Sequence, residues 1–132
     1  MRLASMTEYG EASANTRKLI ADRKEFLIRN LSASRPHVAN GKSRMPHRWR
    51  LDYEAAVRAG TVLYEVRSWN TPIAWYVEDE GWVMPPIGYT SYTSRHQALV
   101  RRALKDAGIS PRVNLRREHL GIRIDWPWEA AS

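Results

Sequence analysis

The 132-residue chain contains no cysteine, and it has no apolar run near the length of about 18 residues that spans a membrane. The missing cysteine excludes disulfides, thiol nucleophiles and cysteine metal sites together. The first residues also lack the apolar stretch of a secretory signal. We therefore expect no membrane span and a reducing, cytoplasmic setting.

Patterns that carry metal or phosphate chemistry are scarce as well. The chain has four histidines, and they are scattered without an i, i+4 pair: His37, His47, His96 and His119. Neither a Walker-type loop nor a GxGxxG fingerprint is present. The acidic residues 78–80 could hold a hard cation, or they could form a solvated turn. We expect no metal and no cofactor.

His96 is the best candidate for a catalytic imidazole, because hydroxyl side chains precede it in residues 89–104, YTSYTSRHQALVRRAL. A Ser–His mechanism would also need a group that orients the ring and an oxyanion site. The spacing of His96 to Leu99 and Val100 instead places it on the apolar face of a helix. Both interpretations stay open, and packing is the favoured one, so we expect no enzyme.

Positive charge is the strongest compositional signal. The 21 bases exceed the 14 acids by 7, and arginine accounts for 17 of those bases. This balance favours polyanionic partners, although a GC-rich genome would enrich arginine equally. Residues 31–51 hold five bases and no acid, residues 52–92 are acidic, and residues 94–117 hold seven bases against Asp106. Two basic segments therefore flank an acidic centre.

Hydrophobic periodicity predicts an α+β protein. Residues 15–31 are typical of an amphipathic helix, and residues 51–60 of a short helix closed by Gly60. Alternation in residues 61–69 and 72–79, followed by WVM at 82–84, predicts about three antiparallel strands. We expect Val62, Tyr64 and Val66 to share one face of the first strand. On the second strand, we expect Ile73, Trp75 and Val77 to share a face.

A last helix is expected to begin at Ser94, which has capping-box spacing to Gln97, and to end at Gly108. It packs on one face of the small sheet. The segments are then an N-terminal helix (1–31), a basic linker or arm (32–50), a small α+β core domain (51–108) and a basic, tryptophan-containing tail (109–132). The linker contains Pro36, Gly41 and Pro46 and shows no periodicity.

Residues 68–104 resemble a domain of small, uncharacterised bacteriophage proteins. Its features are an S-[YW]-x-T-x-I-A strand and, after a variable hairpin, a Y-S-x-T-[ST]-x-H turn into a helix. The matching positions are Ser68, Trp69, Thr71, Ile73, Ala74, Tyr89, Ser91, Thr93, Ser94, His96 and Gln97. Coverage is roughly residues 46–108. The resemblance implies a phage origin and a bacterial host cell, with virion association as a second location, but no reaction.

The leading hypothesis is a non-enzymatic phage accessory protein that binds nucleic acid or a nucleoprotein. The expected contact residues lie in the arm and the last helix: Arg44, Arg48, Trp49, Arg50, Arg95, Arg101, Arg102 and Lys105. The element order is also similar to that of double-stranded-RNA-binding domains, a topological likeness alone.

The alternative is a protein-binding module that inhibits a host factor or attaches to the phage particle. It would use Trp126 and Trp128, which could equally fold back over the sheet. The formation of an oligomer is also left open by the sequence.

Overall fold

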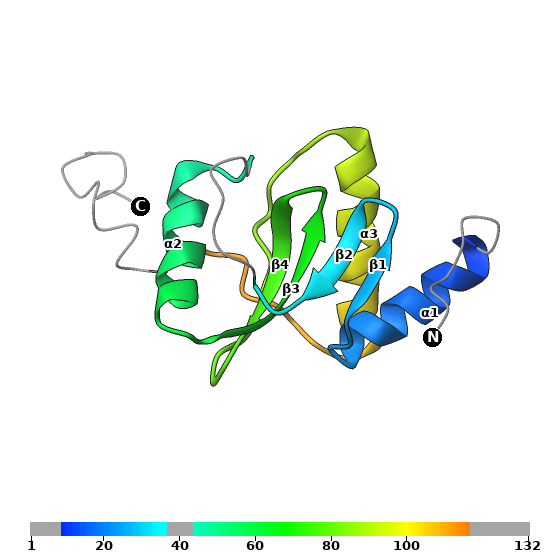
Figure 1. Cartoon of the computed structure of the whole chain (residues 1–132), viewed down its shortest axis with the longest axis horizontal. Helices are drawn as coiled ribbons and strands as arrows, with labels where there is room; N and C mark the ends of the chain where they lie inside the picture. Colours follow the sequence, from blue (N-terminus) through cyan, green and yellow to red (C-terminus); the bar gives the residue numbers. More distant parts are fainter. Residues whose placement is uncertain (1–8, 37–43, 117–132) are drawn as a thin grey trace.

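A five-stranded antiparallel sheet with helices on both faces forms the centre of the protein (Figure 1). The computed structural model describes residues 9–36 and 44–116. The strands lie in sequence order: β1 (Phe26–Ile28), β2 (Leu31–Ser34), β3 (Val62–Ser68), β4 (Thr71–Val77) and β5 (Gly81–Val83). The helices are α1 (Tyr9–Ala21), α2 (His47–Arg58) and α3 (Ser91–Asp106). The α+β class is confirmed, with five strands in place of about three.

The first helix ends ten residues earlier than its apolar pattern predicts. α1 stops at Ala21, and Arg23 then adopts a left-handed φ of 55°. The Arg23 amide donates to the Ile20 carbonyl (3.0 Å) and the Lys24 amide to the Leu19 carbonyl (2.8 Å), which together form a Schellman motif. The expectation of one helix through residue 31 is therefore wrong, and β1 and the start of β2 occupy its second half.

The other two helices end in the same motif, with glycine in the left-handed position. Gly60 follows α2 with φ of 74°, and Gly108 follows α3 with φ of 73°. Both glycines had marked these ends in the sequence. Glycine adopts this conformation at no steric cost, so the helix ends that it marks are predictable, whereas the one at Arg23 is not.

The start of the last helix also differs from the prediction. Thr90, with extended φ and ψ of −62° and 162°, is the N-cap, and its hydroxyl accepts a hydrogen bond from the Thr93 amide (3.4 Å). The Ser94 amide already donates to the Thr90 carbonyl (2.8 Å), so Ser94 lies inside the helix. Gln97 donates its side-chain amide to the Ile87 carbonyl (2.8 Å) and closes no capping box.

The sheet separates two hydrophobic cores. On one face, residues of α1 and α3 such as Ile20, Val100 and Leu104 pack on the sheet. On the other face, α2 places Trp49 and Tyr53 against the sheet. Figure 1 shows α2 on one side of the sheet and α3 on the other. Both faces of β3 and β4 are therefore covered, while α2 leaves the outer face of β1 and β2 open.

Two irregularities between β3 and β4 alter the expected alternation. The register shifts between Val62 and Tyr64, so Val62 joins the α2 side while Tyr64 joins the α3 side. A second shift leaves Ile73 without a partner on β3, so Ile73 faces the α3 side and Trp75 the α2 side. Each bulge turns one residue to the opposite face. The predicted shared faces of Val62 with Tyr64 and of Ile73 with Trp75 are wrong for this reason.

The two predicted extensions belong partly to the folded domain. The expected arm, residues 32–50, contains most of β2 and the first turn of α2. The first residues of the expected tail run beside β5, where the Arg112 amide donates to the Trp82 carbonyl (2.8 Å) and the Arg112 carbonyl accepts from the Met84 amide (2.9 Å). Residues 37–43 and 117–132 lie outside the described residues.

Candidate functional site

The exposed side of α3 carries a stripe of positive charge, the α3 stripe, made of Arg95, Arg101, Arg102 and Lys105. These four side chains are exposed because the opposite side of the helix is buried through residues such as Val100 and Leu104. Arg102 pairs with Asp106 at 3.3 Å, an i, i+4 contact that orients one guanidinium along the helix. The prediction that these bases face solvent is confirmed.

The second half of the stripe lines a shallow concavity of about 690 Å³ at the end of the helix. Arg101, Arg102 and Lys105 contribute to one wall, and the turn of residues 108–111 contributes to the other. Three cations around one concave surface create a positive potential that suits an anion such as phosphate.

Two exposed aromatic rings lie at the start of α3, at the other end of the helix from this concavity. Trp69 is 53% exposed and Tyr92 is 40% exposed, and their ring centroids lie 6.0 Å apart at an interplanar angle of 66°. Tyr92 in turn packs edge-on against His96 at 4.9 Å. The other tryptophans of the described segments are buried, so Trp69 is distinctive in leaving its ring in solvent.

The aromatic pair sits beside two neighbouring hairpin turns. Arg29-Asn30 joins β1 to β2, and Trp69-Asn70 joins β3 to β4, each as a two-residue loop. Arg29 and Trp69 both have left-handed φ values, 54° and 58°, at a turn position where glycine is common. The Trp69 amide donates to the Asn30 carbonyl at 2.7 Å and so fixes one turn against the other.

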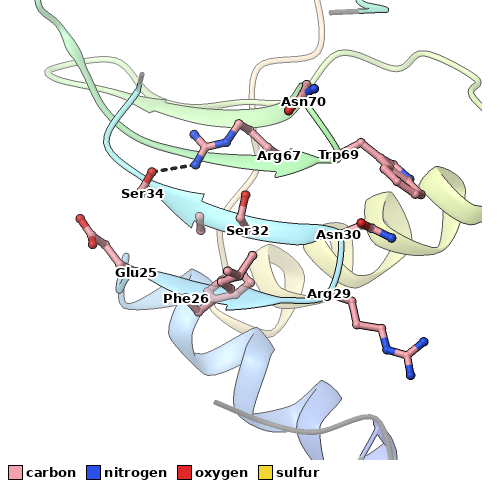
Figure 2. Close-up of a pocket in the computed structure, with 11 residues that line it drawn as sticks. Glu25, Phe26, Arg29, Asn30, Ser32, Ser34, Arg67, Trp69 and Asn70 are labelled. Atoms are coloured by element: carbon pink, nitrogen blue, oxygen red, sulfur yellow. Dashed lines mark hydrogen bonds between the residues drawn. The ribbon is translucent and has the colours of Figure 1, made fainter. Parts of the chain in front are cut away.

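From these turns an open groove of about 660 Å³ runs across the outer face of β1 and β2 as far as Arg67 near the end of β3 (Figure 2). Trp69 and Asn30 lie at one end of it, and Glu25 lies at the other. In its middle, Arg67 donates to the Ser34 hydroxyl at 2.8 Å and also pairs with Glu65. The groove exists because α2 covers only the β3–β5 part of this face.

A buried polar network supports the aromatic pair from below. His96 Nδ1 and the Ser68 hydroxyl are 2.7 Å apart, and the Ser68 hydroxyl lies 3.1 Å from the Thr93 hydroxyl. Burial lowers the pKa of His96, which favours the neutral imidazole. Ser68 is fully buried and His96 is 4% exposed, so a substrate has no direct path to either. The geometry gives His96 a packing role.

Arg44 closes this network from outside. Its guanidinium donates to the Thr93 hydroxyl at 3.1 Å and lies 5.6 Å from the centre of the Tyr89 ring, and its amide donates to the Thr71 hydroxyl at 3.1 Å. The two sequence motifs of the phage resemblance, one on β3–β4 and one at the start of α3, therefore meet in one hydrogen-bonded cluster. Arg44 acts there as a tether between them.

The remaining bases of the expected arm lie elsewhere. Arg48 and Arg50 are partly buried residues of α2, on the face of the sheet opposite α3. Trp49 is 6% exposed, packs on Trp75 with a centroid distance of 6.4 Å and lies under Arg112. An open, base-stacking Trp49 was therefore a wrong expectation, because the arm is helical at this point and its apolar side faces the sheet.

The acidic turn of residues 78–80 contributes to an ion-pair cluster. Asp52, fully buried, accepts from Arg112 at 3.0 and 3.1 Å and from the Arg116 amide at 3.1 Å. Glu80 pairs with both arginines, at 3.3 and 2.8 Å. Within the described segments, no group of three or more His, Cys, Asp or Glu residues could hold a metal ion.

The bases of the α3 stripe were predicted from the sequence, but the aromatic pair of Trp69 and Tyr92 beside it was not. Trp69 and Tyr92 are far apart along the chain, and a turn tryptophan gives no sign of exposure. The repeated pattern of a large residue followed by asparagine, Arg29-Asn30 and Trp69-Asn70, was the available signal. Trp126 and Trp128, expected to bind a partner, lie outside the described residues.

None of the described helices is long and apolar enough to cross a membrane. No protein-family model, curated protein or solved structure matches the chain. The functional interpretation therefore depends on the geometry alone.

Proposed function

We propose that this protein is a non-enzymatic nucleic-acid-binding protein and that the α3 stripe contacts the phosphate backbone. The observation that carries the proposal is the exposed row of Arg95, Arg101, Arg102 and Lys105 on one helix face. At about 1.5 Å of rise per residue, the row is about 15 Å long, so it can reach several successive phosphates.

Two further features support phosphate as the ligand. Three of the four bases are arginines, whose planar guanidinium binds phosphate through two parallel hydrogen bonds. Asp106 is paired with Arg17 at 3.4 Å as well as with Arg102 at 3.3 Å, so its charge is offset. Arg48 and Arg50 are not expected in the interface, since α2 lies on the face of the sheet opposite α3.

From the sequence resemblance to bacteriophage proteins alone, we propose that the protein acts inside an infected bacterial cell, where phage and host nucleic acids are both present. We propose that the protein acts there by binding nucleic acid or a nucleoprotein.

Fluorescence polarisation with labelled oligonucleotides at about 50 and 200 mM salt tests the proposal. Four phosphate contacts predict that affinity falls about 50- to 150-fold between these salt concentrations. The double variant Arg101→Gln/Arg102→Gln should bind more weakly at low salt and lose only about tenfold over the same range, because two contacts remain.

The matched control is Lys18→Gln/Arg58→Gln, which also removes two positive charges. Both side chains are exposed, on α1 and α2, and neither belongs to the stripe. The control should bind nearly as well as the wild type. Equal weakening in both double variants would show that net charge alone attracts the oligonucleotide, and would contradict the proposal.

A further inference from the structure

The exposed Trp69 side chain needs an explanation that the fold does not provide. A tryptophan that is 53% exposed contributes little to a core, and this one also occupies a left-handed turn position. Residues held in such conformations concentrate at functional sites. The other large hydrophobic side chain exposed in the groove, Leu27, lies in a regular strand and shows no such strain.

The ring of Trp69 is in contact with other side chains although it is exposed. Its edge-to-face contact with Tyr92 is followed by the contact of Tyr92 with His96, and His96 is fixed by the hydroxyl of Ser68, the residue before Trp69. This closed chain of contacts restrains both aromatic rings before any ligand arrives. A restrained aromatic surface binds a flat ligand with less loss of side-chain freedom than a mobile one.

The polar groups around the ring match the edge of a nucleobase. Asn30 and Asn70 belong to the two adjacent turns, and each side-chain amide offers both a donor and an acceptor. In the described part of the chain, neither side-chain amide has a hydrogen-bond partner. These amides are therefore open to a ligand that presents both kinds of group.

The charges around the aromatic pair favour one direction for a nucleic-acid strand bound there. Arg29 is exposed at the tip of one turn, and Arg95 follows Tyr92 by about one helical turn on α3. At the other end of the groove lies the exposed carboxylate of Glu25, as Figure 2 shows. A phosphate backbone is favoured beside the two arginines and disfavoured beside the carboxylate. The favoured path leads from the aromatic pair onto the α3 stripe.

We propose that Trp69 and Tyr92 bind an unstacked nucleobase and that the nucleic acid recognised by this protein is therefore single-stranded. The inference rests on the proposed function, because the same strand would continue along the α3 stripe. In a duplex the ring faces of the bases are stacked on one another and Trp69 would have no partner, whereas a single strand can turn its bases out onto aromatic side chains. Single-stranded DNA and RNA share this chemistry.

Abasic oligonucleotides isolate the contribution of the bases. We would compare, by fluorescence polarisation, a 12-nucleotide oligo-dT, an abasic oligomer of the same charge, an oligo-U and a hairpin duplex. The wild type should bind oligo-dT about five- to hundredfold more tightly than the abasic strand and more tightly than the duplex. The ratio of oligo-U to oligo-dT affinity identifies the preferred sugar.

The decisive variant is Trp69→Gly, since glycine suits the left-handed backbone and removes the ring. In this variant oligo-dT and the abasic strand should bind equally. Tyr92→Leu, in the first turn of α3, should reduce the same ratio and provides a second variant if the first folds poorly. The matched control is Leu27→Ala, which removes an exposed apolar side chain from the same groove and should leave the ratio unchanged.

The outcomes separate this inference from the proposed function. If the wild type binds oligo-dT and the abasic strand equally while Arg101→Gln/Arg102→Gln still weakens both, phosphate binding stands and the nucleobase site is overturned. A duplex preference that Trp69→Gly leaves intact overturns it also. If no nucleic acid binds at either salt concentration, the proposed function fails, and the inference fails with it.

Discussion

At the scale of single residues, the two hairpin turns beside α3 combine an unfavourable backbone with a compensating contact. A left-handed φ costs a non-glycine residue about 1–2 kcal/mol. The edge-to-face contact of Trp69 with Tyr92 can return about 0.5–1.5 kcal/mol of this, while no such ring contact offsets the cost at Arg29. The tryptophan turn therefore recovers part of its backbone cost through a ring contact, whereas the arginine turn does not.

His96 makes stability depend on pH. Burial lowers its pKa in the folded protein below the ordinary value of about 6.5. Below that pH the unfolded chain takes up a proton that the folded chain resists, so the stability present above about pH 6.5 is lost as pH falls toward the folded pKa. We expect the free energy of unfolding to decrease by up to about 1.4 kcal/mol per pH unit in this window.

Urea denaturation at several values between pH 5 and 8 measures this dependence. His96→Asn should be less stable than the wild type at pH 7.5 but should lose this contribution to the slope, because its amide does not titrate. His47→Asn, at the exposed start of α2, is the matched control and should keep the wild-type slope. A slope that survives in His96→Asn would assign the effect to other groups.

At the scale of the elements, the features predicted correctly from the sequence are those that a glycine or a regular hydrophobic spacing indicates. The ends of α2 and α3, the hairpin of β3 and β4, and the burial of one side of α3 follow from such signals. The end of α1 was missed because Arg23 occupies the place of a glycine. β1 and β2 were missed because they are three and four residues long and their turn contains no glycine. In each case tertiary packing outweighs local preference.

The segment after α3 depends on one buried carboxylate. Burial alone would lower the pKa of Arg112, but its hydrogen bonds and charge interactions with Asp52 and Glu80 raise it, so it stays charged beside them. We expect Asp52→Asn to lower the free energy of unfolding by about 3 kcal/mol, near the lower limit for breaking a buried pair, because Arg112 is 21% exposed.

Chemical denaturation measures this loss, and hydrogen exchange of residues 109–116 should accelerate. Glu54→Gln removes a carboxylate whose contact with the exposed Arg58 is long, at 4.0 Å. As the matched control it should change stability by less than about 0.5 kcal/mol. Equal effects of the two variants would contradict a special role for Asp52.

At the scale of the whole molecule, the sheet keeps the two basic segments apart. α2 with Arg48 and Arg50 lies on one face, and the α3 stripe lies on the other. The sequence revealed that both segments are basic, but only the three-dimensional arrangement decides whether they form one surface. For the same reason the pairing of Trp69 with Tyr92 could not be predicted, since a sheet–helix contact joins them across 22 intervening residues.

This separation predicts how charge removal on α2 affects binding. Arg48→Gln/Arg50→Gln should reduce oligonucleotide affinity by less than about threefold at about 50 mM salt, because only the long-range field changes. The salt dependence should stay that of the wild type. Fluorescence polarisation against the same oligonucleotides measures both, and a loss as large as that of Arg101→Gln/Arg102→Gln would place α2 in the interface.

The residues that run beside β5 also bear on how the protein avoids self-association. A strand at the border of a sheet presents unpaired amides and carbonyls that can template the addition of another chain. Here the backbone of Arg112 occupies the border of β5 through its bonds to Trp82 and Met84, while the opposite border is only the three residues of β1. If the segment around Arg112 detached, the backbone amides and carbonyls of β5 would be free to pair with another chain, next to the apolar Val83. Because Asp52 binds Arg112 and Arg116 and so holds this segment in place, we expect it to oppose aggregation as well as unfolding.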